Sequence, residues 1–184
     1  MTSVERVLSV GCGAPGGAPL AREFFARRAD RVARALLGCL LVRSGGAFII
    51  SETEAYLGPH DLACHSAKGR TPRTEVMFGE PGHAYLYLVY GMHWCLNVTT
   101  GGGAGVLIRG VQGISGPGRL TRALGLDKRF YGWDLCAPSE LFLAEGDGRR
   151  RTIQVGARVG VDYAGAWAHK PLRYLLAPSI LSSK

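Results

Sequence analysis

The sequence predicts an α+β fold: a single domain with a largely antiparallel curved sheet or open barrel, peripheral helices and a protruding β-hairpin. Three observations lead to this prediction. One helical pattern of apolar residues lies near the N-terminus, several strand-like runs follow it, and glycine-containing turns separate those runs. A chain of 184 residues with 47% hydrophobic residues is long enough for one globular domain but short for two.

The first part of the chain is a Gly- and Ala-rich segment, residues 1–18, for which we expect a disordered leader; residues 19–184 form the predicted domain. Residues 21–37 predict one helix, because the apolar residues form a single stripe and the arginines lie largely off it. Gly38 can end this helix, since glycine readily takes the left-handed conformation.

Strand signals dominate the rest of the chain. Two hairpins are expected, the first turning at residues 44–46 and the second at Gly91. A short helix is expected at residues 118–124, behind a Gly-Pro pair. The expected strands are residues 39–43, 47–56, 85–90, 92–99, 106–111, 141–144, 152–155 and 172–176.

The charge of the chain favours a polyanionic partner. Lys and Arg total 22 against 14 acidic residues, which gives a net charge of +8. A surplus of this size on a small domain is typical of nucleic-acid binding, although a basic soluble protein with no such partner is the alternative.

We find no apolar run of the length that spans a membrane and no signal peptide. Five scattered cysteines without a CxxC pair fit a reducing, intracellular compartment.

Two carboxylates stand out in the strand at residues 47–56. Ile50, Glu52, Glu54 and Tyr56 have the same parity, so an extended strand places them on one face. The simplest reading is an exposed face with two solvated acids. A carboxylate in a partly desolvated pocket can instead activate a water and stabilise positive charge on a sugar. Arg109, at the end of an apolar strand, is then its expected charge partner.

Aromatic residues accompany these acids. Tyr56, His65 and Tyr87 can enclose a flat, electron-poor or cationic base, although tyrosines on strands are also common core residues. Tyr90 is predicted at the hairpin tip, where an exposed ring can enter the gap that an extruded base leaves in a duplex. Asn97 supplies an amide that can contact the edge of the base.

The order and length of several motifs resemble those of a known family. The stretches are ETEAYLGPHDLACHS (52–66), TPR (71–73), MFGEPGHAYLYLVYGMHWCLNV (77–98), GVLIRG (105–110), GPGRLTRAL (116–124) and RVGVDYAGAWAHKPLRY (158–174). Over residues 20–176 the chain resembles the alkyladenine (3-methyladenine, or N-methylpurine) DNA glycosylase family. The resemblance implies a monofunctional glycosylase that flips damaged purines from duplex DNA and hydrolyses their N-glycosidic bond.

The same resemblance implies further expectations. The substrates would be 3-methyladenine, 7-methylguanine, hypoxanthine and ethenoadenine in double-stranded DNA. No metal or redox cofactor would be needed, and a monomer would act at each lesion, within the cell and near the nucleoid. At matching positions Glu54, and not Glu52, looks like the general base, and Arg109 like the residue that holds the water and carboxylate.

The resemblance also implies roles for the surrounding residues. Tyr56, His65 and Tyr87 look like the walls of the base pocket, and Asn97 like the group that disfavours the exocyclic amine of guanine. The remaining matching positions are Leu107 in the pocket strand and Tyr90, Met92, Arg119 and Lys128 on the DNA side, with Tyr90 intercalating. The sequence departs from the family pattern at Cys64, His93 and Trp94, which can alter the bases accepted.

Other functions fit the sequence less well. A zinc nucleobase deaminase requires H-x-E and P-C-x-x-C, which are absent. A metal site at His60, Asp61 and His65 has too few ligands, so a loop cluster explains these residues better. A non-catalytic damage- or RNA-binding module gains nothing from the Glu54 carboxylate, which repels a polyanion.

Overall fold

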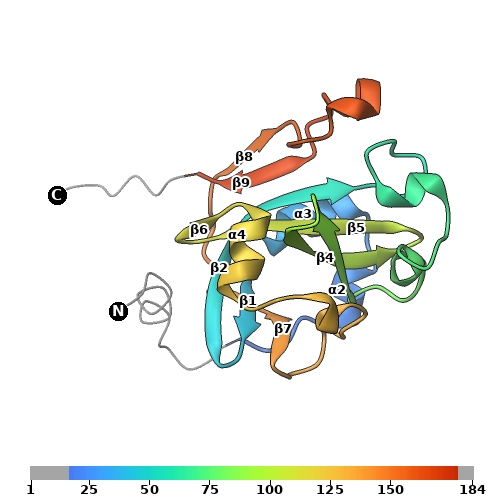
Figure 1. The fold of residues 1–184 in the computed structure, drawn as a ribbon. Helices are drawn as coiled ribbons and strands as arrows, with labels where there is room; N and C mark the ends of the chain where they lie inside the picture. The colour runs from blue at the N-terminus through green and yellow to red at the C-terminus, as the bar shows by residue number, and fades with distance from the viewer. Residues whose placement is uncertain (1–16, 178–184) are drawn as a thin grey trace.

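The computed structural model describes residues 17–177 and is built around a sheet whose strands all pair antiparallel (Figure 1). The strand order is β3-β4-β5-β2-β1-β7; β6 adds to β5, β9 adds to β2, and β8 adds to β9. The strands are β1 Leu40–Arg43, β2 Gly46–Tyr56, β3 Ala84–Val89, β4 His93–Gly101, β5 Ala104–Val111, β6 Ile114–Ser115, β7 Leu141–Ala144, β8 Ile153–Gly156 and β9 Arg173–Leu176.

Few helices accompany this curled half-barrel, which confirms the predicted α+β class. In Figure 1, α3 lies behind the sheet, and it packs against β2 and β5, whereas α4 packs against β4 and β5. The α-helices are α2 Arg22–Phe25, α3 Ala29–Leu36 and α4 Pro117–Ala123. The 3₁₀ helices are η1 His65–Lys68, η2 Glu75–Phe78, η3 Lys128–Phe130 and η4 Asp162–Trp167.

The predicted single helix at residues 21–37 is wrong, because the chain breaks it into α2 and α3. Arg28 between them is extended, with a ψ of 137°. The two helices pack into the same core but against different strands. α2 contacts β4 and buries Phe25, while α3 packs on β2 and β5 and buries Val32 and Leu36. Arg22 holds α2 to the Asp134 carboxylate at 2.8 Å. Tertiary contacts thus override a continuous helical pattern.

The predicted common face for residue 50 and the two acids is also wrong. The pairing of β2 with β5 shifts register between Ile50 and Glu52 and again before Thr53. These irregularities place Ile50 in the main core together with Ala55, although strict alternation would put them on opposite faces. Glu52, Glu54 and Tyr56 lie on the other face of the strand. A β-bulge therefore separates the core half of β2 from its polar half.

Both predicted hairpins are confirmed. β1 and β2 are joined at Ser44 and Gly45, which have φ values of 47° and 83°, as the tight two-residue turn requires. β3 and β4 are joined by Tyr90–Met92, with Tyr90 in the left-handed region at a φ of 51°. The side chains at this second tip face solvent, since Tyr90 is 88% exposed and Met92 71% exposed.

Most of the predicted leader lies outside the described residues. Its last two residues, Gly17 and Ala18, run beside β7, where the Ala18 carbonyl accepts a hydrogen bond from Glu145.

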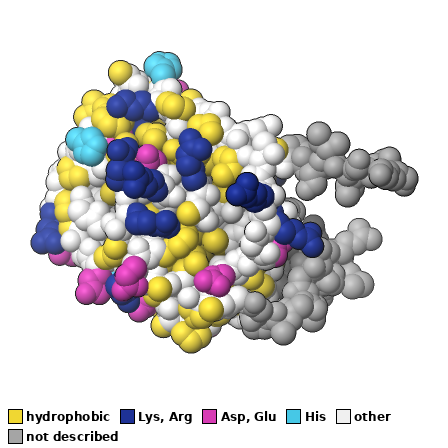
Figure 2. Space-filling model, turned by 180° about the vertical axis from the view of Figure 1, so that it is seen from behind, with side chains coloured by type: hydrophobic (Ala, Val, Ile, Leu, Met, Phe, Trp, Pro, Cys, Tyr) yellow, Lys and Arg dark blue, Asp and Glu magenta, His cyan; other side chains and the backbone are white. Residues whose placement is uncertain are grey.

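Basic side chains are spread over more than one face of the molecule. Figure 2 shows Lys and Arg gathered on the face behind the view of Figure 1, where α2 and α3 lie. Four exposed arginines belong to this segment: Arg27, Arg28, Arg31 and Arg34. Charge alone therefore does not identify which face meets a polyanion.

Candidate active site

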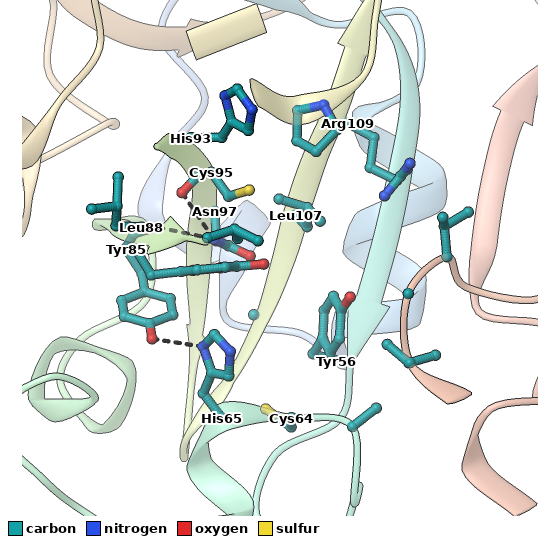
Figure 3. A pocket seen from close by; sticks show the side chains of 18 of the residues that line it. Tyr56, Cys64, His65, Tyr85, Leu88, His93, Cys95, Asn97, Leu107 and Arg109 are labelled. Atoms are coloured by element: carbon teal, nitrogen blue, oxygen red, sulfur yellow. Dashed lines mark hydrogen bonds between the residues drawn. The ribbon is translucent and has the colours of Figure 1, made fainter. Parts of the chain in front are cut away.

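A cavity of about 560 Å³ opens on the face of the sheet opposite α3 (Figure 3). Its walls come from β2, from the β3–β4 hairpin, from β5, from the start of η1 and from the segment at residues 159–163. Seven of the predicted site residues line it: Tyr56, His65, Tyr87, Tyr90, Asn97, Leu107 and Arg109. Segments far apart in the sequence thus converge on one chamber of the size usual for small-molecule sites.

Glu54 is fully buried directly behind the wall of this cavity. Its Oε2 accepts a hydrogen bond from the Tyr56 hydroxyl at 2.9 Å, and its Oε1 accepts one from the Val159 N–H at 2.8 Å. Arg109 Nε lies 3.5 Å from Oε1. All three contacting residues line the cavity, whereas Glu54 itself does not. Burial raises the pKa of the Glu54 carboxyl, and Arg109, Val159 and Tyr56 oppose that rise.

Glu52 is also buried, and it binds two guanidinium groups. Its Oε1 accepts hydrogen bonds from Arg109 Nε at 2.8 Å and from Arg173 Nε at 2.7 Å. Arg109 is therefore closer to Glu52 than to Glu54, and it connects the two carboxylates. The alternative reading of β2, two solvated acids on an exposed face, is wrong, because both acids are buried and paired.

The Tyr56 wall is fixed by a buried ion pair behind it. The Arg158 guanidinium lies 4.7 Å from the centroid of the Tyr56 ring and donates to both oxygens of Asp61, at 2.6 and 2.9 Å. Asp61 also accepts hydrogen bonds from the Leu57 and Ala63 N–H groups. These contacts explain Asp61 as a structural anchor, which agrees with the loop-cluster reading of this segment.

The opposite wall is formed by His65 and Tyr87, whose ring centroids are 4.4 Å apart at 79°. His65 Nδ1 forms a 2.8 Å hydrogen bond with the Tyr85 hydroxyl, which Figure 3 shows beside the cavity. Burial, and then the charges of Arg73 and Lys68, lower the pKa of His65 to about 4. The imidazole is therefore neutral at pH 7 and does not repel a cationic ring.

Tyr85 and Arg73 are site residues to which the sequence prediction assigned no role. Tyr85 and Tyr87 have the same parity in β3 and therefore lie on one face, so the sequence could have indicated Tyr85 as a site residue. Arg73 lines the cavity, with its guanidinium 5.6 Å from the Tyr87 ring centroid. Residues 159, 160, 161 and 163 were missed as well, since nothing local places that segment beside β2.

Asn97 and Leu107 face each other across β4 and β5 and line the cavity together. The Asn97 side-chain amide donates to the backbone carbonyls of Tyr85 at 3.0 Å and Cys95 at 3.4 Å. These bonds use the N–H groups of the amide, so its oxygen is the atom available to a ligand. Asn97 can therefore act as an oriented acceptor.

The predicted DNA-side residues are placed differently from one another. Tyr90 lies at the mouth of the cavity, whereas Met92, Arg119 and Lys128 are exposed and do not line it. Arg119 follows Gly118, which does line it. The structure thus brings Tyr90 to the predicted pocket and leaves the other three on the surface of the protein.

Metal ligands do not cluster within residues 17–177: no group of three His, Cys, Asp or Glu side chains there can hold a metal ion. Cys64 and Cys95 line the cavity, and burial raises the pKa of both thiols, so they remain protonated at neutral pH. None of the helices in this part of the chain has the length and apolar character needed to cross a membrane.

Comparison with known proteins gives consistent matches over most of the chain. The family model described as Methylpurine-DNA glycosylase (MPG) matches residues 23–115 and 112–179. A protein of Myxococcus xanthus is 50% identical over 182 residues, covering 90% of this chain and 93% of its own length. Proteins of Methanocella arvoryzae and Legionella pneumophila are each 43% identical, covering 84% and 90% of this chain and 90% and 98% of their own lengths. All three are named "Putative 3-methyladenine DNA glycosylase".

Proposed function

We propose that this chain, which belongs to the methylpurine-DNA glycosylase family, releases 3-methyladenine and related damaged purines from double-stranded DNA by hydrolysis. Membership of this family gives the general activity, which is that of a monofunctional DNA glycosylase acting in DNA repair. The observation that supports the finer mechanism is Glu54, a fully buried carboxylate held against a cavity by Tyr56, Val159 and Arg109.

The proposed reaction begins when one of the side chains between Glu54 and the cavity moves and admits a water to the carboxylate, which is otherwise fully buried. The water oxygen attacks C1′ of the deoxyribose while the bond to the purine nitrogen breaks, and the electron pair of that bond leaves with the base. Glu54 accepts the proton of the water and stabilises positive charge on the sugar. Each carboxylate oxygen has two acceptor positions, so the bonds to Tyr56 and Val159 leave capacity for the water. The products are a free purine and an abasic site.

The cavity suits a purine that carries positive charge. Tyr56 and His65 lie on different sides of the cavity in Figure 3, and Tyr87, whose ring contacts that of His65, also lines it. Aromatic faces attract a cationic ring by about 0.5–2 kcal/mol per contact, and neutral His65 adds no repulsion. A cationic base such as 3-methyladenine leaves without further protonation. Neutral hypoxanthine or ethenoadenine needs a proton donor. The exocyclic amine of 7-methylguanine can be disfavoured only by the space that the Asn97 side chain occupies, because the amide oxygen would accept a hydrogen bond from that amine.

The exposed hairpin tip supports base flipping. A purine inside a duplex reaches the cavity only after it leaves the base stack, and a side chain that fills the vacancy stabilises that state. Tyr90 fits this role because it is 88% exposed and borders the mouth of the cavity. We expect Met92, Arg119 and Lys128 to contact the DNA around it, with one monomer bound per lesion.

The decisive experiment measures free base released from duplexes that each carry one lesion: 3-methyladenine, 7-methylguanine, hypoxanthine or ethenoadenine. We expect release of at least the cationic purines, and no release by Glu54→Gln, which should still bind damaged DNA. Normal turnover by Glu54→Gln would refute the water-activation role. A protein that binds these duplexes and releases none of the bases would instead be a binding module.

Salt dependence tests the polyanionic substrate separately. Phosphate contacts release counterions, so affinity for the duplex should fall steeply as salt is raised. An affinity that does not change between low and physiological salt would contradict a DNA substrate.

A further inference from the structure

The mouth of the cavity has two exposed apolar edges, and only one has been assigned a role. The first edge is the hairpin tip with Tyr90 and Met92. The second edge, which we call the Tyr163 rim, consists of Val159 and Tyr163, together with Leu62, which precedes the cavity-lining Ala63 in the chain. These side chains are 48%, 70% and 59% exposed, and Val159 and Tyr163 line the same cavity as Tyr90. Exposed apolar groups that adjoin a binding cavity indicate a contact surface.

Tyr163 is held in place although its ring faces solvent. Its hydroxyl donates to the Ala63 carbonyl at 3.2 Å. The neighbouring residues Val161 and Ala164 are buried in a small apolar cluster with Ala63. The backbone on both sides and the hydroxyl are therefore fixed, so the ring is held in place while it remains exposed to a partner. A fixed ring loses little conformational entropy when it meets a flat partner.

We propose that the Tyr163 ring packs against the lesion-bearing DNA strand at the cavity mouth, on the side opposite Tyr90. This inference rests on the proposed function, because it takes that strand as the occupant. A nucleotide that enters the cavity leaves its sugar and its chain neighbours at the mouth, between the two edges. Aromatic rings bind bases and sugars without sequence preference, which suits an enzyme that must act at any position.

The cavity also offers a cation to the same strand, on a different part of its lining from the Tyr163 rim. Arg73 is exposed, lines the cavity and lies over the Tyr87 ring on the His65 side. Proteins that bind single-stranded nucleic acids combine basic side chains with aromatic rings in the same way.

The two exposed tyrosines should differ in the DNA form that needs them. Tyr90 fills a gap in a base stack, and that gap exists only in a duplex. Tyr163 touches the strand that carries the lesion, which is present in a duplex and in a single strand alike. Loss of the Tyr90 ring should therefore weaken duplex binding alone, whereas loss of the Tyr163 ring should weaken both.

The test measures binding to oligonucleotides that carry a tetrahydrofuran abasic-site analogue, as duplex and as single strand, by fluorescence anisotropy at one salt concentration. Tyr163→Ala should weaken both about tenfold, as loss of one ring–base contact does. Tyr163→Phe is the matched control, because it keeps the ring and removes only the bond to Ala63, and it should stay within about twofold of the unchanged protein. Tyr90→Ala should weaken duplex binding alone.

Two outcomes would overturn the proposal. One is unchanged affinity of Tyr163→Ala for both DNA forms; the other is a loss confined to the duplex. A loss shared equally by Tyr163→Phe would also count against it, since the hydroxyl bond and not the ring would then matter. The assay does not depend on base release. Failure of the proposed function would appear separately, as an unchanged protein that releases no base from any lesion.

Discussion

Glu52 and Glu54 lie two residues apart on the same face of β2, and both are buried, yet their surroundings differ. Glu52 accepts hydrogen bonds from the guanidinium groups of Arg109 and Arg173. Glu54 accepts hydrogen bonds from a hydroxyl and a backbone N–H, and it shares Arg109 at the longer distance of 3.5 Å. One acid is neutralised by two cations, and the other is left partly uncompensated.

This difference separates stability from reactivity. A buried carboxylate with two cationic partners is stabilised as an ion. Burial raises the pKa of Glu54, and a raised pKa makes a carboxylate a stronger proton acceptor. Arg109 connects the two, because Glu52 holds the guanidinium that faces Glu54. Replacement of Glu54 should therefore mainly reduce the rate of base release, whereas replacement of Glu52 should mainly reduce stability.

The largest effect is expected from Glu54→Gln on the rate of base release. Removal of a general base typically costs about 10²–10⁴-fold, so release should fall by about that factor or become undetectable. Single-turnover kinetics on a lesion-containing duplex would measure it. A rate within a few-fold of that of the unchanged protein would contradict the assignment of Glu54, and not Glu52, as the general base.

Glu52→Gln should reduce the free energy of unfolding by about 3 kcal/mol, because it leaves the two partly buried guanidinium groups of Arg109 and Arg173 without their shared anion. Chemical denaturation at pH 7 would measure the loss. Base release should also fall, but less than in Glu54→Gln, since Arg109 is displaced rather than removed. Equal losses of rate in the two variants would show that both acids act in the chemistry.

Stability should respond to pH with a sign that identifies Glu54. Its folded pKa is raised, so its stabilising contribution is complete below the unfolded pKa and is lost as pH rises through the folded pKa. Glu54→Gln, which does not titrate, should therefore gain stability relative to the unchanged protein as pH rises to 7–8. Thermal unfolding of both proteins from pH 4.5 to 8 would measure the difference. If the stability of Glu54→Gln instead falls relative to the unchanged protein as pH rises, the raised pKa is contradicted.

The smallest effect is expected from Arg173→Met. Arg173 is more exposed than Arg109, and Glu52 keeps its bond to Arg109 in this variant. A loss of about 1 kcal/mol of stability is expected, with base release changed only a few-fold. The same denaturation and kinetic assays apply. An effect on rate as large as that of Glu52→Gln would show that Arg173 contributes more than neutralisation.

Much of the site could be predicted from the sequence because its signals are local. The parity of Glu54 and Tyr56, the turn at Gly91 and the exposed Tyr90 all follow from the period of a strand and the chemistry of a turn. The strand at residues 141–144 is found where it was expected. The helix at residues 21–37 failed because periodicity cannot show that Phe25 and Val32 lie on helices that pack against different strands.

The sequence by itself determined the family, the class of fold and seven of the residues that meet at the cavity, since these depend on motifs and short-range patterns. Only the tertiary structure decided how the two acids of β2 divide their roles. The partner Arg173 lies 121 residues from Glu52, the Val159 N–H lies 105 residues from Glu54, and the bulge after Ile50 arises from pairing with β5. Contacts of this kind leave no local pattern, because burial and charge pairing depend on which distant segments the folded sheet brings together.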